Sequence, residues 1–230
     1  TPWTLFANQA ICFNESFNYC LIHEKSQDEY LIIAEDTLDS IPFGQKSYSI
    51  ITTFNGKALA NLFYTNPLLK NDDQHPLVSG LHVTKTAGTG LVHTAPGHGT
   101  DDYLVGMKNN LSVFSPVDSY GNYDLTQFEN PELKQFLSDP KDSSKGRNVL
   151  SKETTDSIIA RLTQLQMLFS QSDYTHSYPY DWRSKLPVII RSTPQWFIDL
   201  TEIKGMAMET LKDVKFVPNR GEYRLKAFIK

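Results

Sequence analysis

The stretch Gly88–Tyr103, GTGLVHTAPGHGTDDY, is the most informative part of this 230-residue chain. A short β-prone run, Leu91–Thr94, lies between two glycine-containing turns, which predicts a strand that ends at a chain reversal. After the second turn, Thr100 is a suitable N-cap. Asp101 and Asp102 would then fall in the first turn of a helix, where the dipole favours carboxylates. The stretch therefore predicts strand, turn and helix in succession, with polar side chains gathered at the turn.

Two imidazoles, His93 and His98, accompany these carboxylates, and three uses are open: a metal site, an acid–base or substrate-binding site, and a capped helix start. The spacing of the histidines matches neither the helical nor the strand offset of common metal pairs, which argues against a metal. A carboxylate at a helix N-terminus can hold an ammonium group. The structural alternatives are that Asp102 only stabilises the helix start, that His93 is a half-buried core histidine and that His98 is a loop residue.

The rest of the chain predicts an α+β fold. Short β-prone runs alternate with turn residues in the first half, for example Ala10–Phe13, Tyr30–Ala34 and Leu81–Thr84. Residues 138–146 are polar and favour a surface loop. Two helices are indicated by apolar residues at helical spacing. The first has Ile158, Leu162, Leu165 and Leu168, with Ser151 or Thr154 as its N-cap, and the second has Leu200, Ile203, Ala207, Leu211 and Val214. Tyr178–Phe197 is strand-like.

Composition excludes several function classes. The net charge of −4 gives no overall basic surface for nucleic acid. The sequence contains no run of 18 apolar residues, the length needed to cross a membrane. Cys12 and Cys20 are too few for a disulfide framework and lack a second pair of zinc ligands, so we expect buried, inert thiols. The serine-hydrolase elbow, the phosphate loop and the dinucleotide-binding glycine motif are all missing. The chain begins at Thr1 without a methionine, so we expect a piece of a longer protein.

Four blocks in order resemble the domain that interrupts the catalytic fold of isoleucyl-tRNA synthetases. They are TPWTLFAN (Thr1–Asn8), GTGLVHTAPGHGTDDY (Gly88–Tyr103), SPVDSYG (Ser115–Gly121) and HSYPYDWRSKLPVIIRSTPQWF (His176–Phe197). The resemblance covers essentially the whole chain and is closest to the bacterial and mitochondrial type. It implies a β-barrel-like editing core with peripheral helices at residues 1–175, and a return segment with a helix leading to the catalytic domain at 176–230.

The resemblance also implies a function and its residues. The family removes valine from mischarged valyl-tRNA(Ile) by hydrolysing the aminoacyl ester. Asp102 would bind the α-ammonium of the substrate, and His93 would shape the side-chain pocket. Thr1, Thr4 and Asn8 would line the pocket around the terminal adenosine and the water, and Asp102, His93 and Thr4 are the catalytic candidates. The domain itself would need no metal or cofactor, since ATP and Mg²⁺ belong to the catalytic domain of the full-length enzyme.

The expected partners are the 3′ acceptor end of tRNA(Ile) carrying valine and the catalytic domain of the same chain, with no membrane. The expected location is the mitochondrial matrix, and otherwise the cytoplasm. The alternative function is a domain that binds the acceptor end, or spaces the parts of the enzyme, without hydrolytic activity. A third hypothesis, a zinc-dependent hydrolase, predicts loss of activity with chelators.

Overall fold

The computed structural model describes residues 1–25, 28–41, 48–69, 73–86, 88–173, 175 and 177–229. These residues form two compact units, Thr1–Ser192 and Thr193–Lys230. All described strands belong to the first unit. Among the described residues, no helix is both long enough and apolar enough to cross a bilayer.

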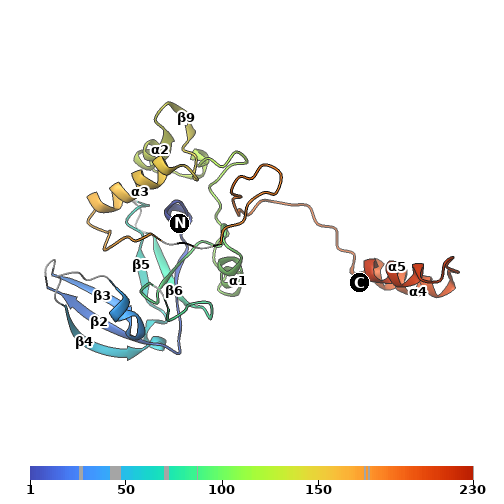
Figure 1. Ribbon diagram of the computed structural model, residues 1–230, viewed down its shortest axis with the longest axis horizontal. Helices are drawn as coiled ribbons and strands as arrows, with labels where there is room; N and C mark the ends of the chain where they lie inside the picture. Colours follow the sequence, from blue (N-terminus) through green and yellow to red (C-terminus); the bar gives the residue numbers. More distant parts are fainter. Residues whose placement is uncertain are drawn as a thin grey trace. The chain divides into compact units, whose positions relative to one another are not determined.

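Two larger sheets and one hairpin form the described β part of the first unit (Figure 1). The mixed sheet has the order β5–β6–β1–β7, in which β1 runs parallel to β6 and antiparallel to β7. Its strands are β1 (Ala10–Phe13), β5 (Phe63–Thr65), β6 (Gln74–Ser79) and β7 (Val92–Thr94). The antiparallel sheet has the order β3–β2–β4, with strands β2 (Asn18–Glu24), β3 (Glu29–Ala34) and β4 (Tyr48–Asn55). A small hairpin consists of β8 (Ser138–Asp139) and β9 (Asp142–Gly146).

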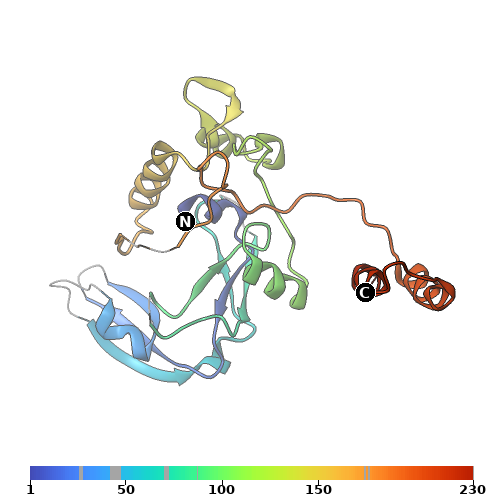
Figure 2. The same ribbon diagram turned by 45° about the vertical axis from the view of Figure 1, so that its right-hand side comes forward.

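Short helices connect and cover these strands. The α-helices of the first unit are α1 (Thr100–Lys108), α2 (Pro131–Leu137) and α3 (Lys152–Gln164). The 3-10 helices are η1 (Pro2–Ala7), η2 (Glu35–Ser40), η3 (Gly56–Leu59) and η4 (Leu125–Gln127). Both views place the β8–β9 hairpin and the three-stranded sheet at opposite ends of this unit (Figures 1 and 2). The predicted α+β class is confirmed, and in the described ranges the ladders form open sheets without a closed barrel.

Local signals explain the starts of two of the α-helices, α2 and α3. Asn130 caps α2 by accepting hydrogen bonds from two backbone N–H groups of the first turn, and Pro131 occupies the first helical position. The predicted Ser151 cap of α3 is confirmed, since its hydroxyl accepts from the N–H of Thr154 at 3.1 Å. The predicted Thr100 cap is wrong, because α1 already begins at Thr100 and Gly99 is its N-cap residue.

The helix η1 is fixed in the core at the N-terminal end of β1. Phe6 and Trp3 are buried in a cluster with Tyr123, and α3 packs against η1. The Tyr123 hydroxyl donates to the Trp3 carbonyl at 2.8 Å in a buried setting. This bond and the surrounding apolar contacts fix the backbone from which the neighbouring Thr4 projects.

Three local predictions are wrong. Residues 81–84 are not a strand. The strand in this part of the chain is β6, which pairs with β1 and already ends at Ser79. Residues 138–146 form the β8–β9 hairpin, which lacks the apolar alternation that marks a half-buried strand. Tyr178–Phe197 is mostly irregular, with one isolated bridge between Tyr180 and Pro187.

The first unit extends to Ser192, beyond the expected division at 175/176. The segment 177–192 is tied to it by backbone carbonyls: Ser192 N–H donates to Gly97 O at 2.8 Å, and the Arg191 guanidinium donates to Val117 O at 2.6 Å. Residue 176 lies outside the described residues.

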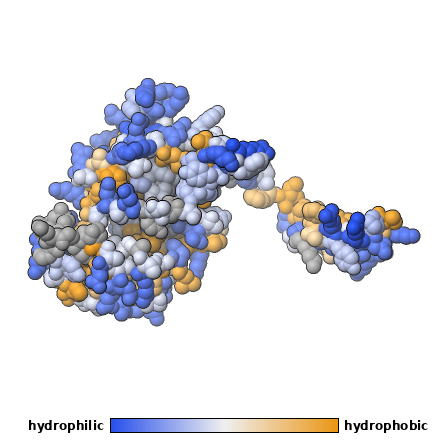
Figure 3. All heavy atoms as spheres, in the orientation of Figure 1, coloured by the Kyte–Doolittle hydropathy of each residue, from blue (hydrophilic) through white to orange (hydrophobic). Residues whose placement is uncertain are grey.

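The second unit contains α4 (Thr201–Thr210), η5 (Leu211–Asp213) and α5 (Gly221–Ile229). The predicted second helix is confirmed as α4, and it ends at Thr210, where the 3-10 helix η5 follows. Hydrophobic residues lie at the surface of the second unit (Figure 3). The most exposed large side chains there include Trp196, Phe197, Ile198, Val217 and Phe228.

Candidate functional site

The predicted turn between β7 and α1 is confirmed and is tightly constrained. The His98 N–H donates to the Ala95 carbonyl at 2.9 Å and closes the turn. A Cβ atom at Gly97 would lie 2.2 Å from the backbone oxygen of Phe114, so no side chain fits at this position. The local sequence Ala-Pro-Gly-His-Gly therefore holds the start of α1, and with it Asp102, against the end of β7.

His93 lies on β7 opposite Ile11 of β1, and both of its ring nitrogens have side-chain partners. Its Nδ1 lies 2.8 Å from Asn8 Nδ2, and its Nε2 lies 3.0 Å from Thr4 Oγ1. Asn8 Nδ2 also donates to the Ala10 carbonyl at 3.0 Å, and the Tyr64 hydroxyl donates to Asn8 Oδ1. The structure thus connects two predicted residues, Thr4 and Asn8, through a third, His93.

The donors and acceptors fix the direction of this chain of hydrogen bonds. Asn8 Nδ2 uses one proton on the Ala10 carbonyl and the other on His93, so His93 Nδ1 must accept. The opposite orientation of the amide would set its oxygen against the carbonyl, which has no proton. The proton of the neutral ring therefore sits on Nε2 and is donated to Thr4 Oγ1, whose own proton goes to the Thr1 carbonyl at 2.9 Å.

The electrostatics agree with a neutral imidazole. Burial, above all, lowers the pKa of His93 from 6.5 to about 4. Burial also raises the pKa of Tyr64 above its ordinary value, so this hydroxyl keeps its proton. The neutral ring of His93 can hold the Thr4 hydroxyl in place through Nε2–H. The lone pair on His93 Nδ1 already accepts from Asn8, so the ring has no free nitrogen with which to take a proton from a substrate or water.

Asp102 lies in the first turn of α1 and faces the end of β7. Its Oδ2 accepts a hydrogen bond from the Ala95 N–H at 2.7 Å, and no partner of Oδ1 is found among the described residues. Burial raises the pKa of Asp102, and the bond from Ala95 opposes that shift. An ammonium group beside Oδ1 would stabilise the ionised form further.

One pocket of about 520 Å³ brings the site together. Of the predicted residues, Thr1, Thr4, His93 and Asp102 line it. Asn8 does not; it is buried behind His93, with 4% of its surface exposed, and acts on the pocket through the ring. The lining also includes Trp3, His98 and Ile190, together with Leu91 and Val92.

Sequence reasoning missed Tyr64 and gave His98 no role. Tyr64 comes from β5, a strand two places away from β1 in the sheet, and no local pattern indicates that its hydroxyl reaches Asn8. His98 is part of the turn motif, and its position in the pocket depends on Ile190, whose carbonyl lies 3.0 Å from its Nδ1.

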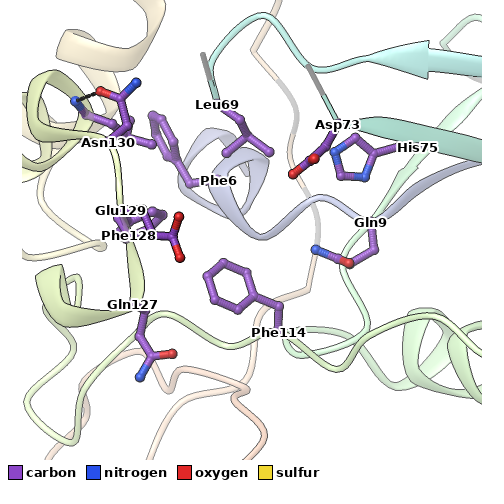
Figure 4. A pocket seen from close by; sticks show the side chains of 11 residues that line it. Phe6, Gln9, Leu69, Asp73, His75, Phe114, Gln127, Phe128, Glu129 and Asn130 are labelled. Carbon is purple, nitrogen blue, oxygen red and sulfur yellow. Dashed lines mark hydrogen bonds between the residues drawn. The ribbon is translucent and has the colours of Figure 1, made fainter. Parts of the chain in front are cut away.

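A larger pocket of about 720 Å³ lies elsewhere in the first unit and contains none of the five predicted residues (Figure 4). Figure 4 shows Phe6, Phe114 and Phe128 around it, with Asp73 and His75 near β6 and Glu129 opposite. A large volume does not by itself indicate a reaction. The pocket of about 520 Å³, in which the polar side chains of Thr4, His93 and Asp102 converge, is therefore the candidate site.

The described part of the chain contains no group of three or more metal-ligating side chains. Both cysteines are buried and free, as predicted. Cys12 and Cys20 lie in different sheets, and burial raises the pKa of the Cys12 thiol to about 11. A thiol with such a pKa is a poor nucleophile at neutral pH.

The fold is that of the CP1 domain of aminoacyl-tRNA synthetases. The crystal structure of GlLeuRS-CP1, from a leucyl-tRNA synthetase, matches with a TM-score of 0.55 and 16% identity over 75% of this chain and 81% of that chain. This likeness concerns the fold.

Sequence similarity gives the family. The mitochondrial isoleucine–tRNA ligase of Saccharomyces cerevisiae is 47% identical over 230 residues, covering 100% of this chain and 23% of that protein. The isoleucine–tRNA ligase of Crocosphaera subtropica is 38% identical over 229 residues, or 98% of this chain and 22% of that protein. The chain belongs to the isoleucine–tRNA ligase family and corresponds to one region of these longer proteins. It spans less than a quarter of the length of these relatives, and no family model matches it.

Proposed function

We propose that this chain is an editing domain that hydrolyses the ester bond of valyl-tRNA(Ile) after valine has been transferred to the tRNA. The observation that carries the proposal is the pocket between η1, β7 and α1, where the half-buried Asp102 has one carboxylate oxygen on Ala95 and the other without a partner among the described residues. Membership of the isoleucine–tRNA ligase family supports the choice of substrate.

The physical need for such an activity comes from the size of the side chains. Isoleucine and valine differ by one methylene, and isoleucyl-tRNA synthetases are themselves the known example in which one binding step discriminates only about 150-fold. A second pocket can reverse the selection, because a rigid wall that accepts valine excludes the larger isoleucine. The apolar side chains of Leu91, Val92 and Ile190 line the pocket and are suited to contact the valine side chain.

Asp102 would anchor the substrate through its α-ammonium group. A charge-assisted hydrogen bond of this kind is worth roughly 1.5–3 kcal/mol, and it favours aminoacyl esters over other esters. The fixed turn from Ala95 to Gly99 holds the carboxylate in place, so the substrate is oriented when it binds. Orientation of an already activated ester beside a water molecule supplies acceleration through proximity, without a nucleophilic side chain.

Thr4 and His93 would serve this orientation together. Because His93 Nε2–H donates to Thr4 Oγ1 and that hydroxyl donates to the Thr1 carbonyl, Thr4 retains one lone pair in a fixed direction. That lone pair can accept a hydrogen bond from water or from the terminal ribose. Asn8 takes part from behind the pocket by fixing the ring of His93.

The partners follow from the same proposal: the 3′ acceptor end of tRNA(Ile) and the catalytic domain of the same protein. That domain, and not this one, would bind ATP and Mg²⁺. A mitochondrial matrix location is supported by the mitochondrial relative from yeast, and a cytoplasmic location is the alternative that the bacterial relatives support.

The test is the deacylation of valyl-tRNA(Ile) by the full-length enzyme with Asp102→Asn. This change keeps the shape and the acceptor for Ala95 while it removes the charge. We expect a loss of about 10- to 100-fold, the rate equivalent of one charge-assisted hydrogen bond. Asp101→Ala is the matched control, since Asp101 is exposed in the same helical turn and should leave the rate unchanged.

The outcomes separate the hypotheses. Full activity of Asp102→Asn would remove Asp102 from the mechanism. Absence of hydrolysis in the wild type would favour a domain that only binds or spaces the acceptor end. Loss of wild-type activity with a chelator would favour a zinc-dependent hydrolase.

A further inference from the structure

His98 is a second histidine of the pocket, and its chemistry is not used by the arrangement described above. It is buried, with 9% of its surface exposed, and it lines the same pocket as Asp102 and Thr4. Its ring packs edge-on against Trp3, with centroids 4.9 Å apart. It comes from the turn that Gly97 makes possible, so its backbone position is fixed.

The tautomer of His98 is determined by its partner. The Ile190 carbonyl has no proton, so Nδ1, at 3.0 Å from it, must be the protonated nitrogen. In the neutral ring, Nε2 then carries a lone pair and can only accept. This atom is buried and has no hydrogen-bond partner among the described residues.

An unpartnered buried acceptor is uncommon in folded proteins and calls for a partner. The charged and titratable groups around it do not provide one. Arg191 donates to the Val117 carbonyl, His93 is engaged at both nitrogens, and Asp102 has no proton when ionised. The partner of Nε2 must therefore be a donor that enters the pocket.

We propose that His98 Nε2 is a substrate-contacting acceptor that receives a hydrogen bond from an O–H group of the bound aminoacyl ester complex. The inference rests on the proposed editing function, because hydrolysis of a ribose aminoacyl ester needs two O–H donors in the pocket: the attacking water, and the ribose hydroxyl next to the ester. Both present the same chemistry to Nε2. Burial lowers the pKa of His98, which keeps the ring neutral and able to accept at neutral pH.

Two variants separate the nitrogens of His98 in the full-length enzyme. His98→Asn retains an N–H near the position of Nδ1 for the Ile190 carbonyl, but places nothing at Nε2. His98→Gln reaches the position of Nε2 with an acceptor oxygen, but loses the bond to Ile190. We expect His98→Asn to slow single-turnover deacylation of valyl-tRNA(Ile) by about 10-fold or more and His98→Gln to retain more of the rate, with aminoacylation unchanged in both.

The two donors are distinguished by inhibition of deacylation with non-hydrolysable amide-linked valyl-adenosine, prepared with and without the neighbouring ribose hydroxyl. If the ribose hydroxyl is the donor, His98→Asn weakens inhibition only by the analogue that has it. If water is the donor, the variant lowers the rate and leaves both inhibition constants unchanged. Either result supports an acceptor role for Nε2.

A wild-type rate for His98→Asn, together with a large loss for Asp102→Asn, would overturn the inference and leave the editing function standing. A slow His98→Gln beside an unimpaired His98→Asn would likewise reduce His98 to a structural contact with Ile190. If the wild type does not hydrolyse valyl-tRNA(Ile), or Asp102→Asn is fully active, it is the proposed function that fails.

Discussion

The hydrogen-bond chain through His93 predicts a particular response to the substitution Asn8→Asp. The two side chains have the same shape, but a carboxylate has no proton to donate. It would face the Ala10 carbonyl at 3.0 Å and the lone pair of His93 Nδ1 at 2.8 Å, where the amide now donates to both. The contact with His93 becomes favourable when Nδ1 gains a proton while Nε2 keeps the one it donates to Thr4, so that the ring is an imidazolium paired with the new carboxylate.

The magnitude and its sign follow from the pKa of His93. In the wild type, the lowering of the His93 pKa from 6.5 to about 4 corresponds to about 3 kcal/mol of folding stability. Because the folded pKa is depressed, this contribution is complete above pH 6.5 and is lost as the pH falls towards 4. In the variant the folded pKa is raised, so the contribution of the ion pair is complete below about pH 6.5 and is lost as the pH rises.

We therefore expect Asn8→Asp to be destabilised by about 2–4 kcal/mol near pH 8, where two buried acceptors face each other, and by clearly less near pH 5. Urea unfolding followed by tryptophan fluorescence over this range measures the difference. Asn55→Asp is the matched control, because Asn55 is exposed and its oxygen only accepts, from Lys57 N–H at 3.2 Å. A difference between Asn8→Asp and wild type that does not vary with pH would refute the tautomer assigned to His93.

Two further substitutions test how the fold holds the site. Gly97→Ala forces a Cβ to within 2.2 Å of a backbone oxygen, so we expect a loss of about 1–3 kcal/mol in urea unfolding and slower deacylation, whereas Gly205→Ala, with nothing within 4 Å, should cost no stability. Tyr123→Phe leaves the buried Trp3 carbonyl without its donor, and should lower the free energy of unfolding by about 1–3 kcal/mol, while Tyr120→Phe, at an exposed position, should have no effect. Equal stability of either pair would contradict the corresponding contact.

The sequence predicted the site best where its parts are close along the chain. His93 on β7 and Asp102 in the first turn of α1 flank one tight turn, and local turn chemistry was sufficient to predict that they are close. Thr4 could be placed only through the family resemblance, because the contact with His93 spans 89 residues. The position of Asn8 behind the ring was not predictable from either source, since a buried amide and a pocket amide occupy the same sequence pattern.

The hairpin at residues 138–146 shows why polarity alone misleads. Its strand β9 carries Asp142, Ser144 and Lys145, and the Asp142 carboxylate accepts a hydrogen bond from the Ser144 N–H of the same strand at 3.1 Å. An exposed ladder needs no apolar face, so hydrophobic periodicity gives no signal there. Tyr64 was missed for a related reason: its function depends on sheet order, which a single sequence does not reveal.

The hydrogen-bond chain also has a consequence for selectivity by size. From Tyr64 through Asn8, His93 and Thr4 to the Thr1 carbonyl, each donated proton has one acceptor, and the hydrogen bonds connect the sheet to the 3-10 helix η1. A pocket that excludes one additional methylene must not expand to admit it, and apolar contacts alone leave side chains free to repack. A buried, fully paired network resists that movement, because any shift leaves a polar group unsatisfied. Under the proposed editing function, the residues behind the pocket would set its selectivity as much as those that line it.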